Sequence, residues 1–387
     1  MSSEIHEKLL ELARAVREAG GRAFMVGGCV RDRLMGVAAK DWDVEVYGVE
    51  PRRLREILDR LAREHRLGRV NAVGEAFTVY KLGLDLDVSL PRRERKAGRG
   101  HRGFVIEGDP SMGVEEAARR RDFTINAVLE DPLDGQLLDP FGGRADLEAK
   151  LLRAVSRDTF AEDSLRVLRA AQFAARFEFD IEAGTIELCR AIDLSDLAAE
   201  RVWGELEKIL LRARRPSVGL RWLDELGAVK QLFPAIESLK GVEQQFEWHP
   251  EGDVFVHTLL TVDRARELIE DLDYPRRVTV MLGALCHDFG KPSTTAFVEG
   301  RIRSRGHEEA GVAPTESFLE RLKVYTLEGY DVRSQTVALV RDHLKPGEFY
   351  RTRDKLGDGA FRRLARRCEL ELLYRVAKAD TLGRNAD

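Results

Sequence analysis

The sequence predicts an α+β protein, with a sheet-containing head at its N-terminus and only helices beyond it. Within the first 90 residues, short β-rich segments surround a single strong helical pattern, which is typical of a small mixed or antiparallel sheet with helices. From residue 144 onward, apolar residues recur at helical spacing in segments such as EDSLRVLRAAQFAARF and ERVWGELEKILLRARR. These two observations predict structurally different halves of the chain.

The head begins with a predicted helix over residues 4–19, whose apolar positions share one face and whose pattern ends at Gly20-Gly21. The β-rich segments AFMVGG and DWDVEVYGV follow, then a helical pattern at 51–65, and then FTVYKLGLDLDVSL. Residues 91–117 lack periodicity and are rich in Arg, Gly and Glu. We expect a long flexible loop there, because loops longer than about 15 residues are usually functional or disordered.

Two changes in composition divide the rest of the chain. The pattern becomes helical after residue 144, and the polar segment VEQQFEWHPEG lies at 242–252. We therefore predict three domains: a head at 1–145, a helical neck and body at 146–241, and a second helical domain at 242–387.

Composition narrows the function classes. The 387 residues include 63 Lys and Arg against 67 Asp and Glu, a net charge of −4 that argues weakly against nucleic-acid binding. That average conceals basic regions, because residues 91–121 hold nine Lys or Arg and five Asp or Glu, and FRRLARR adds another basic face. No apolar run approaches the roughly 20 residues of a membrane span. The four cysteines (Cys29, Cys189, Cys286 and Cys368) form no CxxC pair, which favours a reducing, cytoplasmic location.

A candidate metal site lies in the segment KDWDVEVYGV. In a strand, Asp41, Asp43 and Glu45 share one face while the apolar residues between them face the other way. Such carboxylates repel one another unless a cation is present, and two Mg²⁺ ions roughly 4 Å apart would satisfy them. The segment LDLDVSL predicts a further acidic strand, with Asp85 and Asp87 on one face. A solvated strand edge explains an isolated DxD pattern equally well.

The segment before this strand suits a phosphate group. Gly27 and Gly28 lie where a strand passes into a helix, so backbone N–H groups could approach an anion closely, and Arg31 adds a charged donor. An ordinary strand-to-helix turn explains the two glycines on their own.

These motifs resemble the nucleotidyltransferase superfamily related to DNA polymerase β. The segments RRRDFTINAV at 119–128, LDPFGGRADLEAKLLRAV at 138–155, EDSLRVLRAAQFAARF at 162–177 and RVWGELEKIL at 201–210 resemble, in that order, motifs of the bacterial class II CCA-adding tRNA nucleotidyltransferases and poly(A) polymerases. The resemblance implies a polymerase-β-like head followed by an all-α neck and body.

The resemblance also implies residue roles. Asp41 and Asp43 would hold Mg²⁺, with Asp87 as a further catalytic carboxylate. The nucleotide would contact Gly27, Gly28, Arg31, Asp122, Asn126, Asp163, Arg166 and Arg169. The spacing of the last three places them along adjacent positions of a helix, where a carboxylate and guanidinium groups could select CTP and ATP. An intrahelical ion pair is the simpler explanation of that spacing.

The basic segment after residue 91 is a candidate RNA-binding flexible loop, formed by Arg92, Arg93, Arg95, Lys96, Arg99 and Arg102. CCA-adding relatives carry a flexible loop here that is linked to the switch from C to A addition. A disordered connector is the alternative.

A second candidate site lies near the C-terminus. The ordered set His257, His287-Asp288, His307, His343 and Asp380 resembles the two-metal version of the HD phosphohydrolase superfamily. Imidazoles and carboxylates suit Ni²⁺, Mn²⁺, Fe²⁺ or Mg²⁺. In the family, HD domains fused to CCA-adding enzymes are associated with 2′,3′-cyclic phosphodiesterase, 2′-nucleotidase and phosphatase activities.

The sequence therefore predicts an enzyme that adds CCA to the tRNA 3′ end from CTP and ATP, with an appended HD phosphohydrolase domain. A relative that adds only CC or only A, or a poly(A) polymerase, is the nearest alternative. A regulatory RNA-binding protein with inactive sites is another, which intact Asp41, Asp43 and Asp122 oppose. We expect no membrane contact and no stable protein partner.

Overall fold

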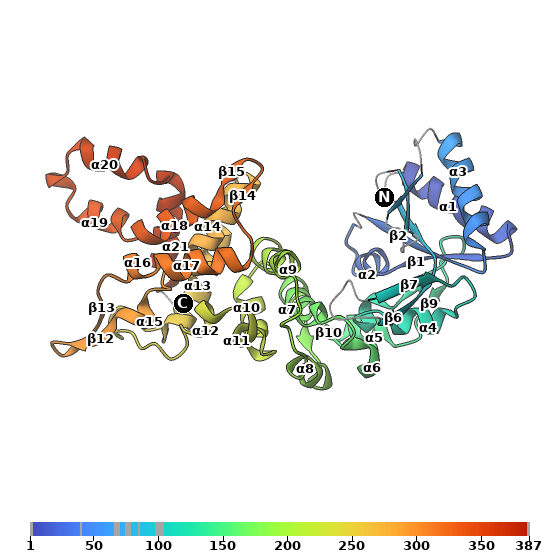
Figure 1. The fold of residues 1–387 in the computed structure, drawn as a ribbon, viewed down its shortest axis with the longest axis horizontal. Coiled ribbons are helices and arrows are strands. Elements are labelled where there is room, and N and C mark those ends of the chain that lie inside the picture. Colours follow the sequence, from blue (N-terminus) through green and yellow to red (C-terminus); the bar gives the residue numbers. More distant parts are fainter. Residues whose placement is uncertain are drawn as a thin grey trace. The chain divides into compact units, whose positions relative to one another are not determined.

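The computed structural model describes residues 3–38, 41–65, 70–73, 79–83, 86–96 and 104–384. The chain packs into two compact units, drawn in Figure 1. The first unit comprises Met1–Arg166 and Asp180–Leu188, and the second comprises Val167–Phe179 and Cys189–Asp387. The three-domain division at 145 and 241 remains a prediction, because compact units need not coincide with functional domains.

The first unit contains a mixed seven-stranded sheet, as predicted, in the order β3-β4-β5-β2-β1-β8-β9. Strands β2 and β5 pair in parallel, and the other neighbours pair antiparallel. The strands are β1 (Arg22–Val26), β2 (Trp42–Tyr47), β3 (Asn71–Val73), β4 (Val79–Leu82), β5 (Leu86–Ser89), β8 (Leu129–Glu130) and β9 (Leu137–Leu138).

Both faces of this sheet are covered. Successive residues of β1 point to opposite faces, so Ala23 and Met25 join one apolar core while Phe24 and Val26 join the other. The first core includes the apolar faces of α1 and α3, which form where the helical spacing predicts them. The helices of this unit are α1 (Ser3–Glu18), α2 (Gly28–Leu34), α3 (Pro51–Glu64), α4 (Val114–Arg119), η1 (Thr124–Asn126), α5 (Gly143–Glu148), α6 (Arg157–Phe160) and α8 (Ala183–Arg190).

The expectation of an unbroken flexible loop over residues 91–117 is wrong for the residues that the structure describes. Strands β6 (Arg92–Lys96) and β7 (Phe104–Gly108) pair antiparallel, and α4 follows them. Consecutive charged residues in β6 remove the apolar alternation that usually reveals a strand, so the pattern could not show it. Arg99 and Arg102 of the predicted loop lie outside the described residues.

The second unit is mainly helical (Figure 1). Its helices are α7 (Leu165–Phe177), α9 (Ala199–Arg212), α10 (Pro216–Glu225), α11 (Ala228–Leu232), α12 (Pro234–Glu237), α13 (Val254–Glu267), α14 (Tyr274–Cys286), α15 (Lys291–Thr294), α16 (His307–Ala310), α17 (Val312–Arg321), α18 (Val332–Asp342), α19 (Lys345–Arg351), η2 (Arg353–Lys355), α20 (Asp358–Ala365) and α21 (Leu370–Gly383).

The prediction of helices alone beyond residue 144 needs a correction, because short strands also form there. The pairs are β10 (Leu151–Leu152) with β11 (Asp180–Ile181), β12 (Thr295–Val298) with β13 (Arg301–Ser304), and β14 (Thr326–Leu327) with β15 (Tyr330–Asp331). With two to four residues each, they are too short to interrupt a helical periodicity in the sequence.

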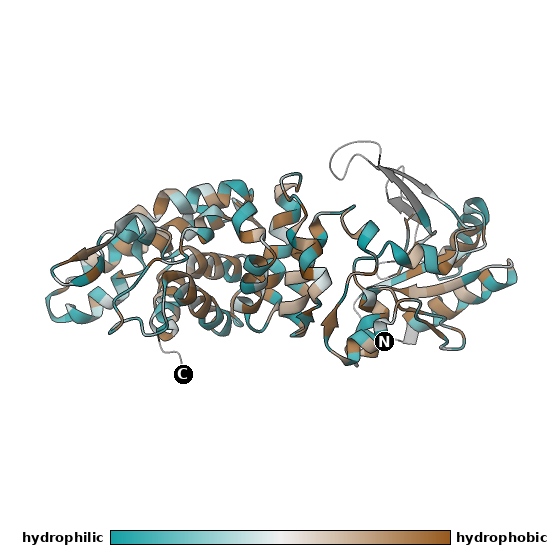
Figure 2. Cartoon of the chain, turned by 90° about the horizontal axis from the view of Figure 1, so that it is seen from below, coloured by the Kyte–Doolittle hydropathy of each residue, from teal (hydrophilic) through white to brown (hydrophobic). Residues whose placement is uncertain are grey.

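Four helices, α13, α14, α18 and α21, pack against one another at the centre of the second unit. Every residue of α14 from Val278 to Cys286 is buried, as expected of a helix that is apolar on all sides. Their apolar residues are buried, and Figure 2 shows hydrophobic residues gathered on helices inside the helical part of the chain. Asp253, Asp273 and Asp331 cap three of the helices by accepting a backbone N–H hydrogen bond. Among the described residues, no helix combines the length and the apolar character that crossing a membrane requires.

Gly290 allows the segment after α14 to lie directly against α16. A Cβ atom at this position would lie 2.0 Å from the carbonyl oxygen of His307 and 2.5 Å from the amide nitrogen of Gly311. Both are backbone atoms, so neither can move without displacing its helix.

We expect Gly290→Ala to lower the free energy of unfolding by about 1–3 kcal/mol, because the added methyl group must displace backbone atoms. Gly204→Ala is the matched control. Gly204 lies inside α9 with nothing within 4 Å of its Cβ position, so alanine should preserve or raise stability there. Thermal unfolding followed by circular dichroism checks both variants, and an unchanged midpoint for Gly290→Ala would contradict this close packing.

Candidate active sites

The parallel pairing of β2 and β5 brings the predicted carboxylates of the first unit together. Asp43 and Asp87 are direct partners in the register, and Asp41 lies just before β2. Trp42, Val44 and Val46 are buried, which confirms the predicted alternation along the strand. Asp85 lies outside the described residues. The structure therefore gathers Asp41, Asp43 and Asp87 at one edge of two adjacent strands.

The surroundings of Asp43 make its charge unfavourable without a cation. Partial desolvation by neighbouring protein atoms raises the pKa of Asp43, and the negative charges of Asp87 and Asp41 raise it further. The positive charges of Arg121 and Lys81 act in the opposite direction. A divalent metal ion would relieve the repulsion among the three carboxylates, so these residues fit a Mg²⁺ site.

Two cations beside this cluster were not identified from the sequence. Lys81 Nζ lies 3.2 Å from Asp87 Oδ1, and Arg121 Nη2 lies 3.7 Å from Glu45 Oε2. Gly27 borders the same place with a φ of +72°, and a Cβ atom there would lie 3.0 Å from Arg121 Nη1. The backbone conformation therefore favours glycine here, whereas the close contact is with the flexible end of the Arg121 side chain. The sequence contains one signal that could have identified Arg121, which is its position directly before Asp122 in RRRD.

Three predicted nucleotide-binding residues form one buried hydrogen-bonded chain. Arg31 Nη1 donates to Asn126 Oδ1 over 2.8 Å, and Asn126 Nδ2 donates to Asp122 Oδ1 over 2.9 Å. The backbone N–H of Phe123 also donates to Asp122 Oδ1. All three side chains of the chain are buried, so the hydrogen bonds fix their positions relative to α2 and η1.

The predicted helical row of Asp163, Arg166 and Arg169 needs a correction, because Asp163 lies before α7 begins. Its side chain accepts a hydrogen bond from the Leu165 N–H, which is the behaviour of a residue at a helix N-terminus. Arg166 donates to the carbonyl oxygens of Thr159 and Arg120. Arg169 lies over the ring of Phe173, 4.9 Å from its centroid. The spacing thus places two of the three residues on α7.

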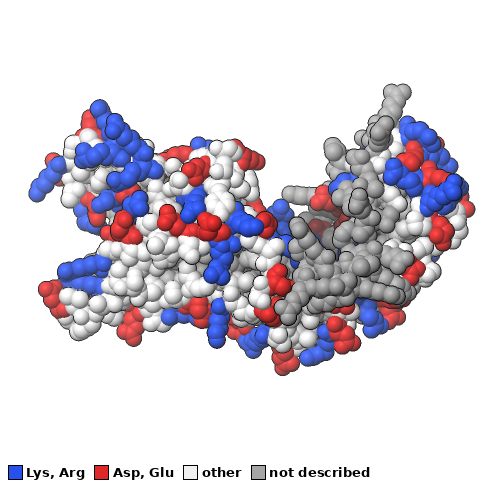
Figure 3. All heavy atoms as spheres, in the orientation of Figure 1, with Lys and Arg blue, Asp and Glu red and all other residues white. Residues whose placement is uncertain are grey.

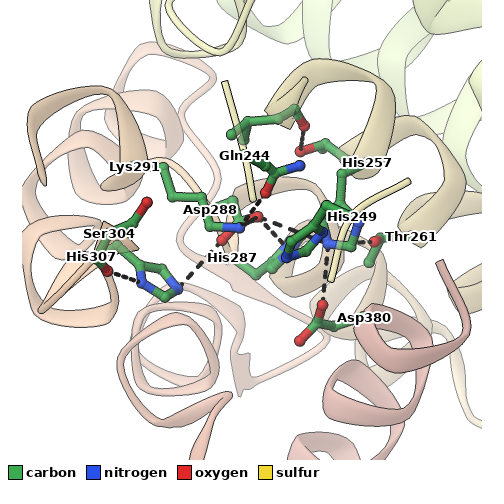
Figure 4. Close-up of polar contacts among 12 residues, drawn as sticks. Gln244, His249, His257, Thr261, His287, Asp288, Lys291, Ser304, His307 and Asp380 are labelled. Atoms are coloured by element: carbon green, nitrogen blue, oxygen red, sulfur yellow. Dashed lines mark hydrogen bonds and ion pairs between the residues drawn. The ribbon is translucent and has the colours of Figure 1, made fainter. Parts of the chain in front are cut away.

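The second unit brings all six residues of the predicted HD set together. His257 lies on α13, the pair His287 and Asp288 follows α14, and His307 begins α16; His343 directly follows α18, and Asp380 lies on α21. Figure 4 shows His257, His287, Asp288, His307 and Asp380 around one centre. All six residues are buried. Helix α14 ends at Cys286, so His287 and Asp288 lie directly at its C-terminus.

The imidazoles share one orientation, which fixes where their lone pairs point. The Nδ1 atoms of His287, His307 and His343 each lie 2.7–2.8 Å from a backbone carbonyl oxygen three residues earlier. A carbonyl only accepts, so Nδ1 carries the proton and Nε2 presents its lone pair to the centre. This arrangement is typical of histidines that bind metal ions.

Two observations test whether this centre fits a metal ion. The Nε2 atoms of His307 and His343 lie 3.2 Å apart, so their lone pairs repel unless a proton or a cation lies between them. His287 Nε2 is also buried and lies 3.1 Å from Asp288 Oδ2, without a hydrogen bond between them. Asp288 Oδ1 lies 3.4 Å from His307 Nε2, and Asp380 Oδ1 lies 3.1 Å from His257 Nε2. The donor set therefore fits divalent metal ions.

Glu251 and His249 belong to this site but were not predicted. Glu251 Oε1 lies 2.7 Å from His257 Nδ1 and 2.8 Å from His249 Nδ1, and the Glu251 side chain is fully buried. His257 therefore turns Nε2 toward the centre, as the other imidazoles do. Its Nδ1 faces the Glu251 carboxylate, whereas theirs face backbone carbonyl oxygens. The signal that could have found both residues is the segment WHPEG, which places them just before the Asp253 cap of α13.

Burial and charge pairing set the ionisation of the cluster. Although burial raises the pKa of Asp288, the neighbouring His287 imidazole and the positive charge of Lys291 hold it well below its usual range. Burial lowers the pKa of His343 to about 3. Burial likewise lowers the pKa of His249 to about 4. Both imidazoles are therefore neutral at pH 7, as metal ligands and hydrogen-bond acceptors require.

The cluster opens into a pocket of about 240 Å³. Asp288, His307, His343 and Asp380 line its base region together with His249 and Lys291, and its remaining lining residues are Gln244, Gln245, Trp248, Ile302, Ser304, Leu344 and Arg384. A ligand can therefore reach four of the six predicted metal ligands from solvent.

Comparison with known proteins agrees with this arrangement. Residues 23–153 match the family model of the Poly A polymerase head domain, residues 178–240 match that of the probable RNA and SrmB-binding site of polymerase A, and residues 254–385 match that of the HD domain. A Thermotoga maritima CCA-adding enzyme, solved in complex with tRNA, has a similar fold with a TM-score of 0.63. At 20% sequence identity, that match covers 100% of this chain and 80% of the other.

Two relatives named "Multifunctional CCA protein" are more similar in sequence. The protein of Xanthomonas campestris pv. campestris is 39% identical over 379 residues, which cover 94% of this chain and 86% of the relative. The protein of Pasteurella multocida is 41% identical over 311 residues, which cover 78% of this chain and 70% of the relative. The resemblance found in the sequence is thereby confirmed, and the chain belongs to the family of multifunctional CCA proteins.

Proposed function

We propose that the first unit adds C, C and A to the 3′ end of tRNA from CTP and ATP. The observation that carries this proposal is the gathering of Asp41, Asp43 and Asp87 beside Gly27, within a head that matches its family model. Two Mg²⁺ ions held by these carboxylates would supply charge neutralisation and activation of the tRNA 3′-hydroxyl. The hydroxyl attacks the α-phosphorus, and pyrophosphate leaves.

The residues around the carboxylates would position the reacting groups. Arg121 and Lys81 contribute positive charge where a triphosphate would lie, next to the backbone of Gly27 and Gly28. Asp122 can accept a hydrogen bond from the ribose 2′-hydroxyl, and the chain through Asn126 to Arg31 holds it in place. We assign Asp163, Arg166 and Arg169 to nucleotide selection, and the basic residues from Arg92 to Arg102 to contact with RNA.

Ordered incorporation tests this function. The protein is incubated with Mg²⁺ and tRNA transcripts that end before the first C, after the second C and after the final A, with CTP and ATP supplied separately and together. Addition that stops after one A supports the proposal. A product ending in CC, or addition of A alone, identifies a specialised relative, and a long A tail identifies a poly(A) polymerase.

We expect Asp43→Asn to reduce incorporation by at least about 10²-fold, because the variant removes a charge that positions metal ions in the transition state. Hydrolysis of 2′,3′-cyclic AMP should be unchanged, because Asp43 lies outside the second unit. The control is Glu115→Gln, an exposed carboxylate on α4. Gel analysis of labelled tRNA measures incorporation by both variants. Incorporation by Asp43→Asn at the wild-type rate would refute the metal assignment.

We also propose that the HD domain hydrolyses phosphate esters such as 2′,3′-cyclic phosphates, 2′-nucleotides or other monoesters. The inward-facing Nε2 atoms and the carboxylates of Asp288 and Asp380 at the pocket support this proposal. The predominance of imidazole favours a transition metal such as Ni²⁺ or Mn²⁺ over Mg²⁺. Bound metal ions would supply an activated water. Lys291, 2.7 Å from Asp288, brings positive charge to the place where a phosphate would enter.

We expect Glu251→Gln to weaken metal binding by about 10- to 100-fold, because Glu251 orients His257 and raises its basicity. Isothermal titration of the metal-free protein with Mn²⁺ measures this directly, without relying on hydrolysis. Glu243→Gln is the control, since Glu243 is exposed in the same segment. Equal affinities of Glu251→Gln and the wild type would show that Glu251 plays no part in the metal site.

A basic surface over α19, η2 and α20 supports a role in binding RNA. Figure 3 shows Lys and Arg gathered over these helices. Arg362, Arg363 and Arg366 are exposed, and none of them pairs with a carboxylate among the described residues. The exposed ring of Tyr350 lies under Arg353, 4.8 Å from its guanidinium carbon. Unpaired positive charges interleaved with aromatic rings suit a phosphate backbone.

Replacing Arg362, Arg363 and Arg366 by Ala should weaken tRNA binding and make it less sensitive to salt. The slope of log K against log salt concentration should become shallower by roughly 0.7–0.9 for each phosphate group that is no longer neutralised. The matched control replaces Lys323, Arg333 and Arg341, whose charges already pair with Glu200, Glu320 and Glu309. Filter binding at several salt concentrations gives both slopes. Equal slopes for the two triple variants would contradict this surface.

A further inference from the structure

The rim of the HD pocket carries an exposed indole that packing does not explain. Trp248 lines the pocket and leaves 63% of its surface exposed. Phe246, in the same segment, is 74% exposed but does not line the pocket. Single exposed aromatic side chains are common on protein surfaces, so the observation that favours a binding role for Trp248 is its position in the lining of the pocket, where an apolar ring with a polar N–H can face a ligand.

The interior of the pocket is polar and charged, in contrast to its rim. Lys291 Nζ lies 2.7 Å from Asp288 Oδ2 and also donates to Gln244 Oε1 over 2.7 Å (Figure 4). Lys291 therefore links the metal-ligand cluster to the segment that carries Trp248. A phosphate bound at the cluster would lie beside this positive charge, with the rest of its ligand directed along the segment toward the rim.

The size of the pocket limits how much of a ligand it can hold. At about 240 Å³, it is smaller than the roughly 300–1,000 Å³ of pockets that enclose a complete small ligand. The phosphate and the sugar would fill it, and an attached base would extend over the rim. Trp248 provides an apolar face at that place.

We propose that Trp248 is a stacking platform for the base of a nucleotide whose phosphate is held at the HD cluster. The substrates are then ribonucleotide phosphates, or RNA ends that carry a 2′,3′-cyclic phosphate or a 2′-phosphate, rather than small phosphate esters without a base. The proposal rests on the hydrolase function proposed above. In the reaction, one water adds to phosphorus and one P–O ester bond breaks, and the released ribose oxygen takes a proton; stacking contributes to binding alone.

The rim would recognise a base without distinguishing its identity. Gln245 Oε1 accepts the backbone N–H of Ile302, and its Nε2 donates to Glu247. Gln244 Oε1 accepts from Lys291. Because these amide groups already have partners while stacking tolerates any base, we expect similar KM values for the cyclic phosphates of A, C, G and U.

The test compares two substrates, 2′,3′-cyclic AMP and glycerol 1,2-cyclic phosphate, which has the same ring but no base. We expect Trp248→Ala to raise KM for the nucleotide about 5- to 150-fold, which is the effect expected from the loss of one base-stacking contact. The value of kcat for the nucleotide should not change, and neither should the kinetic constants for the substrate without a base. Trp248→Phe should recover part of the loss. Phe246→Ala is the control and should behave like the wild type. An equal rise in KM for both substrates, or none for either, would overturn the proposal.

Fluorescence separates this proposal from the hydrolase function. Binding of 2′-AMP should quench tryptophan emission of the wild type, and the quench should be absent in Trp248→Phe, which retains Trp42, Trp203 and Trp222. If the wild type hydrolyses neither substrate, the proposed hydrolase function is wrong. The fluorescence quench on binding of 2′-AMP would still show whether Trp248 contacts the base. A quench that persists in Trp248→Phe would refute the platform.

Discussion

The orientation of four imidazoles is the constraint on which the second unit depends. Three Nδ1 atoms are held by backbone carbonyls and the fourth by Glu251, so every Nε2 atom faces the same buried centre as Asp288 and Asp380. Burying charged groups costs several kcal/mol each unless they are paired. Helices α13, α14, α18 and α21 must therefore deliver these residues accurately, and their apolar contacts and Asp caps provide the rigid frame.

The first unit solves a similar problem with a sheet. The parallel register of β2 and β5 places Asp43 beside Asp87, and buried alternate residues hold both strands against the core. Here the carboxylates lie at an accessible edge, with Gly27 beside them. An accessible edge suits a site that must admit both a triphosphate and an RNA end, whereas the small pocket of the HD domain, about 240 Å³, suits hydrolysis of a single phosphate. One chain thus combines two clusters of candidate metal ligands with different access.

Local patterns in the sequence predicted the residues whose positions follow from chain periodicity or motif spacing. The alternation in DWDVEVY placed Asp41 and Asp43, and the resemblance to the HD superfamily named six candidate metal ligands, which the structure buries together. The side chains that tertiary packing brings against the sites were missed, among them Lys81, Arg121, His249 and Glu251, because only the folded chain shows which carboxylates and imidazoles they contact. The strand β6 was missed since its charged residues conceal alternation, and Asp163 was placed on a helix that begins two residues later.

The central claim is that the inward-facing Nε2 atoms form a preorganised metal centre. Crystals soaked in Mn²⁺ and measured for anomalous scattering test it most directly. We predict anomalous density bordered by the Nε2 atoms of His287, His307 and His343 and by Asp288, with each Nδ1 still bonded to its carbonyl oxygen. Absence of density at this centre at millimolar Mn²⁺, or imidazole rings turned so that Nδ1 faces inward, would contradict the account.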